Sequence, residues 1–335
     1  MIYKNDMKAF FRRLTELSTE GKRFFFLINY PMTEAMLFDL DSKEEDLNKD
    51  SLSFDFGYVN YGYKSTSISP SQKHRELIKH PEPQSEYAKR FDIVYKALKA
   101  GEISLINLTL ATDITCDQSL KEIYLTSKAK YKVLVENRFV CFSPERFIYV
   151  NKDGIVSSHP MKGTISTDVP NAAQVIMDDP KEQAEHANMV KSMEEELAKV
   201  GKNVSVPRYR YIDEIHTEDG GLLQVSSEVR AELASDWREH LGEIIEKLLP
   251  AGSIAGIPKE AAIRVINEAE HHDRGYYSGI SGYFDGEELD TSVMIRFIEQ
   301  SPSGQLIFHS GGGVTIDSIC EREYKEVLAK IYLPK

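Results

Sequence analysis

The chain has 335 residues, a formal net charge of −12 at pH 7 and 41% hydrophobic residues. This composition is typical of a folded protein, and the acidic balance argues against nucleic-acid binding, which needs a basic surface. Its three cysteines form no CxxC motif, which predicts reduced thiols rather than a disulfide framework. No apolar run approaches the ~20 residues of a membrane span. We therefore expect a cytoplasmic protein with no membrane partner.

The first hundred residues predict two helices around an apolar hairpin. Apolar residues recur at helical spacing in 7–17 and again in 87–100, which predicts an amphipathic helix in each segment. The apolar run 23–30 predicts a buried strand, with 36–41 as its hairpin partner. Segment 41–86 is polar and contains three prolines, which favours loops.

From residue 101 onward, strand patterns come in groups that are separated by helices. Short segments rich in β-branched and aromatic residues predict strands at 102–114, 130–137, 138–143, 146–150, 154–158, 203–217, 220–233, 276–284, 289–299 and 305–310. Helical patterns are found at 181–200, 237–249, 258–269 and 320–332. Grouped strands without strict βαβ alternation favour an α+β fold with mainly antiparallel sheets. No linker divides the chain, so we expect a single domain over 1–335.

Two pairs of glutamates could contribute to a metal site. Glu182 and Glu185 are three residues apart on one predicted helix, and Glu323 and Glu326 are three apart on the last one. Residues at this spacing share a helix face. If the two helices faced each other, their carboxylates would suit Mg²⁺, which prefers oxygen ligands. The spacing fits a solvated helix face equally well.

Several other features could bind an anion, and each has a simpler alternative. The glycines 311–313 could present backbone amides to a ligand or form a flexible turn. Segment 252–260 places glycines before a helix start, where a carboxylate could bind. Arg296 could hold a carboxylate or make an edge-strand salt bridge. Lys162, beside Gly-Thr, could be a solvated turn charge, and the histidines 271–272 are interpreted as a helix C-terminus favoured by the dipole.

In chain order, these segments resemble the chorismate-utilising enzymes, the family of anthranilate synthase, isochorismate synthase and aminodeoxychorismate synthase component I. The similar blocks are GEISLINLT, SPERF, HPMKGT, KEQAEH, AGSIAGIPK, the strands around GYF and MIR, HSGGGVTIDS and EREYKEVLAK. The resemblance covers 101–332, and 1–100 is a shortened, divergent N-terminal part. It implies one α+β domain of two large antiparallel sheets packed face to face with helices outside, and chorismate as substrate.

The resemblance also implies roles for individual residues. By motif position, Glu185 and Glu326 resemble direct Mg²⁺ ligands, whereas Glu182 and Glu323 resemble ligands acting through water. Residues that resemble those holding the substrate are Thr164, Ser253, Tyr277, Arg296, Gly311, Gly312, Gly313 and Lys330. Glu145 of SPERF resembles the general acid, which would need a raised pKa. Its alternative is a salt bridge with Arg146.

Lys162 occupies the position at which the branches of the family differ. Anthranilate synthases have P-I-A-G-T and aminodeoxychorismate synthases have P-I-K-G-T, and this chain has PMKGT. The resemblance implies that the lysine attacks ring C2 while the C4 hydroxyl leaves. Ammonia from a separate glutamine amidotransferase subunit then adds at C4 and expels the lysine, giving 4-amino-4-deoxychorismate for folate synthesis. We expect burial near Arg296 and Lys330 to lower the pKa of Lys162.

Four residues depart from the family pattern. Gln224 replaces a histidine, Lys191 and Glu194 replace an aspartate and an arginine, and Ala255 replaces a threonine. The short N-terminal part argues against an allosteric tryptophan pocket. Two alternatives stay open: isochorismate or anthranilate formation, and a catalytically weak chorismate-binding partner protein. Lys162 argues against anthranilate formation.

Overall fold

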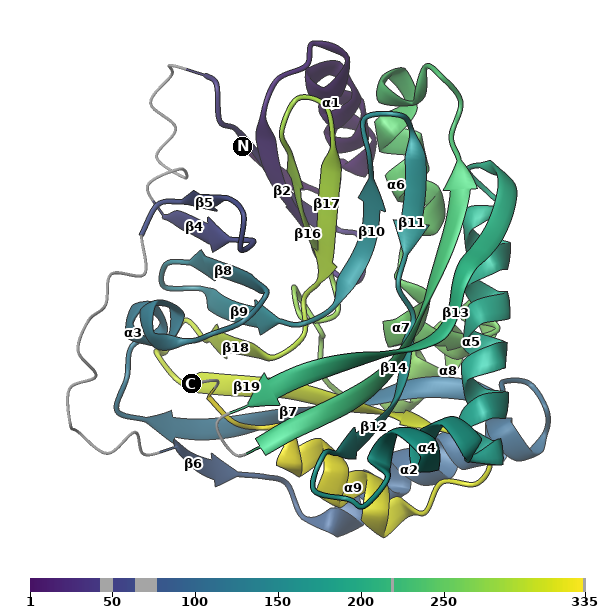
Figure 1. Cartoon of the computed structure of the whole chain (residues 1–335). Coiled ribbons are helices and arrows are strands. Elements are labelled where there is room, and N and C mark those ends of the chain that lie inside the picture. The colour runs from purple at the N-terminus through teal and green to yellow at the C-terminus, as the bar shows by residue number, and fades with distance from the viewer. Residues whose placement is uncertain (43–50, 64–76, 218–219, 334–335) are drawn as a thin grey trace.

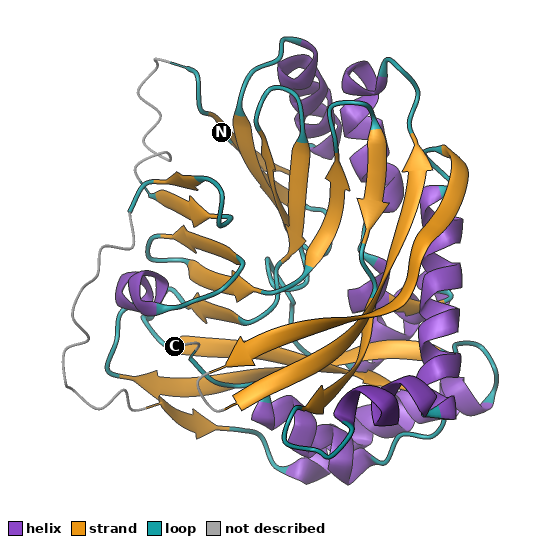
Figure 2. Cartoon of the chain, in the orientation of Figure 1, coloured by secondary structure: helices purple, strands orange, loops and turns teal. Residues whose placement is uncertain are grey.

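Two antiparallel sheets form the centre of the molecule, with helices on their outer faces (Figures 1 and 2). The computed structural model describes residues 1–42, 51–63, 77–217 and 220–333. Within these residues, neighbouring strands of both sheets pair antiparallel. The predicted α+β class with mainly antiparallel sheets is confirmed.

Each sheet combines strands from distant parts of the sequence. The first sheet has the order β1 (Ile2–Lys4), β3 (Glu34–Asp39), β2 (Phe24–Ile28), β16 (Ile280–Phe284), β17 (Leu289–Val293), β10 (Arg146–Val150), β11 (Ile155–Ser158), β14 (Gly220–Glu232) and β12 (Met161–Ser166), and β13 (Lys202–Thr217) also pairs with β14. The second sheet has the order β15 (Gly256–Ile257), β7 (Leu105–Cys116), β19 (Leu306–Val314), β18 (Phe297–Gln300), β9 (Phe139–Ser143), β8 (Tyr131–Val135), β4 (Leu52–Asp55) and β5 (Asn60–Tyr61), and β6 (Leu77–His80) also pairs with β7.

The helices predicted from the sequence begin close to their expected positions, and three short helices, at 120–126, 172–178 and 252–255, were not predicted. In chain order, the helices are α1 (Met7–Thr19), α2 (Gln84–Lys99), α3 (Leu120–Thr126), α4 (Ala172–Asp178), α5 (Pro180–Leu197), the 3-10 helix η1 (Trp237–His240), α6 (Leu241–Leu248), α7 (Gly252–Ala255), α8 (Lys259–Ala269) and α9 (Cys320–Ala329). In α5, the Asp179 side chain accepts hydrogen bonds from the first free amides and Pro180 occupies the first turn, so the start of the helix is fixed by its sequence. In the described part of the chain, no helix is long and apolar enough to cross a membrane.

Aromatic side chains between the sheets hold them face to face. Phe25 of β2 stacks on Phe54 of β4, with ring centroids 4.1 Å apart and planes 7° apart. Both rings are fully buried in a cluster that draws on both sheets. The opposite face of the first sheet packs on α1 and α6. Because β2 is covered on both faces, all five of its residues are apolar and buried, which explains its continuous apolar run.

Three stretches differ from their predicted form. Segment 41–86 contains β4, β5 and β6 as well as loops, and residues 43–50 and 64–76 lie outside the described part. The predicted strand 289–299 is two strands, β17 and β18, which belong to different sheets. Arg296 lies at the crossing with a left-handed φ of 54°, which ends the regular strand. The predicted strand 305–310 continues through the three glycines to Val314.

Candidate active site

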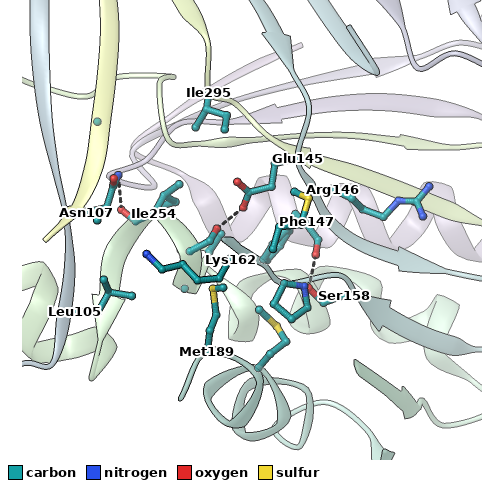
Figure 3. A pocket seen from close by; sticks show the side chains of 18 of the residues that line it. Leu105, Asn107, Glu145, Arg146, Phe147, Ser158, Lys162, Met189, Ile254 and Ile295 are labelled. Atoms are coloured by element: carbon teal, nitrogen blue, oxygen red, sulfur yellow. Dashed lines mark hydrogen bonds between the residues drawn. The ribbon is translucent and has the colours of Figure 1, made fainter. Parts of the chain in front are cut away.

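A cavity of about 250 Å³ opens where α5, α7 and β12 meet the ends of β7 and β19. Most residues that the sequence placed at a binding site line it. These are Lys162, Glu145, Ser253, Tyr277, Arg296, Gly311, Gly312, Gly313 and Lys330. Figure 3 shows the side chains of Lys162 and Glu145 pointing into the cavity. Thr164 is exposed on β12 and does not line the cavity.

The glycine triplet lies inside β19, so the alternative of a flexible turn is wrong. One edge of β19 pairs with β7 along Gly311, Gly312 and Gly313. The other edge pairs with β18 only as far as His309, so among the described residues the triplet has no strand partner on that side. A Cβ atom on Gly311 would lie 3.0 Å from the Tyr277 hydroxyl. Glycine is needed here because neighbouring groups approach the strand backbone closely.

Lys162 is held by a carboxylate from the neighbouring helix. Its Nζ lies 2.8 Å from Glu185 Oε2 of α5. Burial lowers the pKa of Lys162, but the hydrogen bond and charge of Glu185, with the charges of Glu182 and Glu326, outweigh it and raise the pKa. The expected lowering by neighbouring cations is therefore wrong for this structure, because the acidic helices lie closer to the amine than expected.

Glu145 faces the cavity, and Arg146 points away from it (Figure 3). Glu145 Oε1 accepts a hydrogen bond of 2.5 Å from the Ser253 hydroxyl. Burial raises the pKa of Glu145, against the lowering effects of Ser253, Arg296 and Lys330. Arg146 instead binds Asp290 of β17 through Nε and Nη2, at 2.8 and 2.9 Å. The alternative salt bridge between Glu145 and Arg146 is wrong.

The four glutamates lie beside the two lysines of the cavity. Glu326 contacts Lys330 at 2.8 Å, as Glu185 contacts Lys162. Burial, and repulsion from Glu326, raise the pKa of Glu323. Glu182 Oε2 is buried and has no hydrogen-bond partner in the described part of the chain. Among the described residues, no three ligating side chains form a ready-made metal cluster. An orphaned carboxylate oxygen among carboxylates nevertheless fits a hard divalent cation.

Arg296 and Lys330 place positive charge beside the glycine triplet. Arg296 Nη1 donates to the Lys330 carbonyl at 3.2 Å, and its Nε is buried without a partner. Lys330 Nζ donates to the Gly311 carbonyl at 2.9 Å. Within the described residues Arg296 forms no ion pair with a carboxylate, so the edge-strand salt bridge is wrong. The Arg296 Nε, which has no partner among the described residues, and the positive charge of Lys330 beside it suit an anionic ligand.

Comparison with known proteins identifies the family. A family model described as chorismate binding enzyme matches residues 10–334. The chain belongs to this family. It is therefore a chorismate-utilising enzyme, and the resemblance seen in the sequence is confirmed.

Similar proteins agree with this assignment. An uncharacterized PabA-like protein of Pasteurella multocida is 39% identical over 330 residues, which cover 98% of this chain and 99% of that protein. Aminodeoxychorismate synthase component 1 of Bacillus subtilis is 27% identical over 268 residues, covering 75% of this chain and 55% of that protein. The solved structure of a putative 2,3-dihydroxybenzoate-specific isochorismate synthase from Bacillus anthracis aligns with a TM-score of 0.69 at 19% identity. The alignment covers 99% of this chain and 88% of that protein. The last likeness concerns the fold.

The residues that depart from the family pattern do not line the cavity. Gln224 is a cross-strand neighbour of Thr164 on the sheet, and Ala255 is fully buried in α7. Lys191 is exposed on α5, and Glu194 lies two turns beyond His186 on the same helix. None of the four contributes to the cavity wall. These four substitutions therefore do not change the residues that line the cavity.

Sequence reasoning missed the apolar wall of the chorismate-enzyme cavity. Met161 of β12 and Met189 and Met193 of α5 line it. The two helix methionines follow Glu185 at intervals of four residues, so they share its face. That spacing was visible in the sequence. The third methionine lies on a strand that is distant from α5 in the chain, and only the fold brings it to the same wall.

Replacing Gly163 with alanine is expected to impair activity more than stability. Gly163 has a φ of +91°, and a Cβ there would lie 2.9 Å from Glu182 Oε2. We expect a loss of about 1–2 kcal/mol of unfolding free energy from the strained φ, and at least a roughly tenfold loss of kcat/KM because Glu182 must move. Gly304→Ala is the control, since its φ is +88° with only Gln300 Nε2 nearby, at 3.9 Å. Equal activity of the two variants would contradict the prediction.

A buried polar network lies behind the glycine strand. Arg274 binds Glu270 at 2.6 Å, and both side chains are almost fully buried. The Glu270 carboxylate accepts a hydrogen bond from the Thr109 backbone amide. The Thr109 hydroxyl lies 3.0 Å from His272 Nε2. Burial lowers the pKa of His272 to about 4. The dipole interpretation of this histidine is therefore wrong: α8 ends at Ala269, and His272 is neutral near pH 7.

Acidification is expected to destabilise the fold through His272. In the unfolded chain the pKa is near 6.5, whereas in the folded protein it is about 4, so the unfolded state gains the proton first. The contribution of His272 to the unfolding free energy is complete above pH 6.5 and is lost as the pH falls toward 4. We expect about 2 kcal/mol less unfolding free energy near pH 5 than near pH 7 from this group. Urea unfolding at pH 7 and pH 5 measures this difference. The fall in unfolding free energy between the two should be smaller for His272→Gln than for the parent protein, and unchanged for the control His80→Gln at an exposed position.

Proposed function

We propose that this enzyme aminates chorismate at C4 with ammonia, giving 4-amino-4-deoxychorismate for folate and para-aminobenzoate synthesis. The observation that supports this proposal is the position of Lys162 in the cavity wall, in the same space as Glu145. A primary amine and a carboxyl of raised pKa supply a nucleophile and an acid. The retained cationic groups beside the glycine triplet would hold the substrate carboxylates.

The proposed reaction uses the residues of the cavity in a fixed order. Arg296, Lys330 and the unpaired glycine backbone of β19 bind the two carboxylates, and Ser253 and Tyr277 border the ring. The neutral Lys162 amine attacks C2 and the C4–O bond breaks. Glu145 gives its proton to the departing hydroxide. Ammonia then forms the C4–N bond and the C2–N bond to Lys162 breaks. The C4 ammonium group returns one proton to the Glu145 carboxylate, so chorismate and ammonia give the product and water.

Lys162 must lose a proton before it can attack. Its hydrogen bond to Glu185 opposes this, because that contact raises the pKa of the amine. When Glu185 turns to another partner, burial becomes the main influence and favours the neutral amine. Glu185 and Glu326 would hold Mg²⁺ directly, with Glu182 and Glu323 acting through water. Bound there, the ion would neutralise charge on the substrate carboxylate.

A separate glutamine amidotransferase subunit is the proposed source of ammonia. The family match occupies residues 10–334, and these residues include the proposed chorismate site and its supporting sheets. Mixing the enzyme with such a subunit should make glutamine replace ammonium as nitrogen donor. Failure of glutamine to support turnover in that mixture would contradict this part of the proposal.

The product formed from chorismate tests the proposed function. Purified protein is incubated with chorismate, Mg²⁺ and an ammonium salt, and the products are separated by chromatography. 4-Amino-4-deoxychorismate is the expected product. Anthranilate or isochorismate as the main product would replace this function with the corresponding synthase. Bound chorismate without turnover would favour a catalytically weak chorismate-binding partner protein.

Replacing Glu145 with glutamine is expected to lower kcat by about 10²–10⁴-fold, because the amide cannot protonate the leaving hydroxide. Glutamine keeps the size of the side chain and can still accept the Ser253 hydrogen bond. The dissociation constant for chorismate, measured by calorimetry, should therefore change by only a few-fold. Glu287→Gln, at an exposed turn, is the control. A variant with nearly normal kcat would exclude Glu145 as the acid.

A further inference from the structure

A histidine and a glutamate connect the cavity with the surface of the molecule. His309 of β19 lines the cavity and is 2% exposed. Its Nε2 lies 3.0 Å from Glu299 Oε2 of β18. The Glu299 side chain is 42% exposed and lines a separate surface groove with Glu34, Arg138 and Tyr276. The pair thus spans the wall between the cavity and the surface groove.

Contacts on several sides fix the orientation of the His309 ring. The ring stacks on Tyr277, with centroids 5.3 Å apart, and meets the edge of Phe297 at 5.8 Å. The carboxylate of Glu299 accepts the proton of Nε2, so the second nitrogen, Nδ1, is the basic one. Nδ1 is buried and has no hydrogen-bond partner among the described residues. A buried polar atom without a partner calls for a ligand, a water or a catalytic role.

Few other titratable groups face this ring. Tyr277 precedes β16, and its pKa is raised by burial. His272 follows α8, with its ring centroid 6.2 Å from that of His309, and behind it lie Glu270 and Arg274, which neutralise each other. On β7 the cross-strand neighbour is Ala111, which carries no charge. Glu299 is therefore the carboxylate in direct contact with His309.

The proposed amination creates a need for proton removal when its nitrogen arrives as ammonium. Chorismate and ammonium give 4-amino-4-deoxychorismate, water and one proton. The proton that Glu145 gives to the leaving hydroxide ends in water, and the C4 ammonium group first formed replaces it on Glu145. The proton taken from the incoming ammonium must therefore leave the cavity. Apolar side chains such as Met161, Met189 and Met193 line part of the cavity, so it solvates an added charge poorly. A route to solvent therefore favours turnover near neutral pH. This inference rests on the proposed function.

We propose that His309 and Glu299 carry this proton from the cavity to the surface groove. One N–H bond of ammonium breaks, its proton binds Nδ1 of His309, and the ammonia left behind attacks C4 of chorismate. The imidazolium is stabilised by Glu299. The proton on Nε2 then passes to the Glu299 carboxylate and from there to water, and the ring returns its remaining proton from Nδ1 to Nε2 by exchange before the next turnover.

The pH dependence of ammonium use tests this route with His309→Gln and Glu299→Gln. Without a relay the variants depend on dissolved free ammonia, whose fraction rises about tenfold per pH unit below the pKa of ammonium. We expect kcat/KM for total ammonium to fall at least about tenfold near pH 7 and to recover to within about twofold of the parent protein near pH 9. KM for chorismate and the melting temperature should stay unchanged. His240→Gln is the control, because His240 pairs with Asp236 at the surface.

Each outcome bears on the proposal in one direction. Recovery at high pH in both variants supports the relay, and Glu299→Gln keeps the test valid if His309→Gln folds poorly. An equal loss at every pH would show that the pair only holds β18 to β19 and would overturn the relay. The relay would also be overturned if the rate of the parent enzyme already followed the concentration of free ammonia. The proposed amination would stand in that case. A parent enzyme that makes no aminated product at any pH would overturn both.

Discussion

Lys162→Ala is expected to lower the rate of 4-amino-4-deoxychorismate formation by roughly three orders of magnitude or more, because it removes the proposed nucleophile. The dissociation constant for chorismate should change by only a few-fold, since Arg296, Lys330 and the β19 backbone still face the substrate. Initial rates from chromatography of chorismate and its product, with calorimetric binding of chorismate, measure both quantities.

Two further variants separate nucleophilicity from charge. Lys162→Arg keeps a cation beside Glu185 but cannot act as a neutral amine, so it should be nearly as inactive as the alanine variant. Lys181 also contacts Glu185, at 3.7 Å, but its side chain is 57% exposed and does not line the cavity. Lys181→Ala should retain activity within about threefold. Substantial amination by Lys162→Ala would show that ammonia attacks chorismate without a lysine adduct.

Arg274→Met is expected to cost about 3–5 kcal/mol of unfolding free energy, because it leaves the buried Glu270 carboxylate without its cation. Arg274 Nη1 donates to the Ile254 carbonyl at 2.8 Å, and its Nη2 donates to the Asn107 carbonyl at 2.7 Å. These bonds join α7 to β7 at the cavity. Their acceptors would also lose their partner in the variant.

Urea unfolding of Arg274→Met and Arg264→Met compares a buried arginine with an exposed one. Arg264 lies on α8, has a side chain that is 73% exposed and meets Glu102 at 3.9 Å. Its replacement should change the unfolding free energy by no more than about 0.5 kcal/mol. If both variants lost the same small amount, Glu270 would have to be protonated or hydrated in the folded protein, and the ion pair would contribute little.

The sequence predicted local structure better than the places where strands change sheets. The spacing of apolar residues located α1, α5 and α8 because an amphipathic helix repeats its pattern over several turns. The segment 289–299 has a single strand-like pattern, with Thr291, Val293, Ile295 and Ile298 spread along it. This pattern does not change where the chain crosses between sheets. Arg296 marks that crossing by its left-handed φ, which the residue type does not reveal.

The chemistry of the site depended on neighbours that are distant in sequence. The glutamate spacing predicted which carboxylates share a helix face, and these carboxylates do lie near Lys162 and Lys330. Their effect on Lys162 was opposite to expectation, because Glu185 lies within hydrogen-bonding distance of its amine and Arg296 does not. Glycine has a low strand propensity, so the triplet suggested a turn. Its place in β19 depends on pairing with β7, some 200 residues earlier in the chain.

The unpaired edge of β19 bears on how this protein avoids self-association. A strand edge with free amides and carbonyls at the surface can pair with the edge of another chain and start aggregation. Along the glycine triplet no side chains would obstruct such pairing. Here the edge lies inside the cavity, and Gly312 packs close to Val327 of α9. The backbone groups that could recruit a foreign strand thus face the cavity, and its walls keep the strand edge of another chain from reaching them.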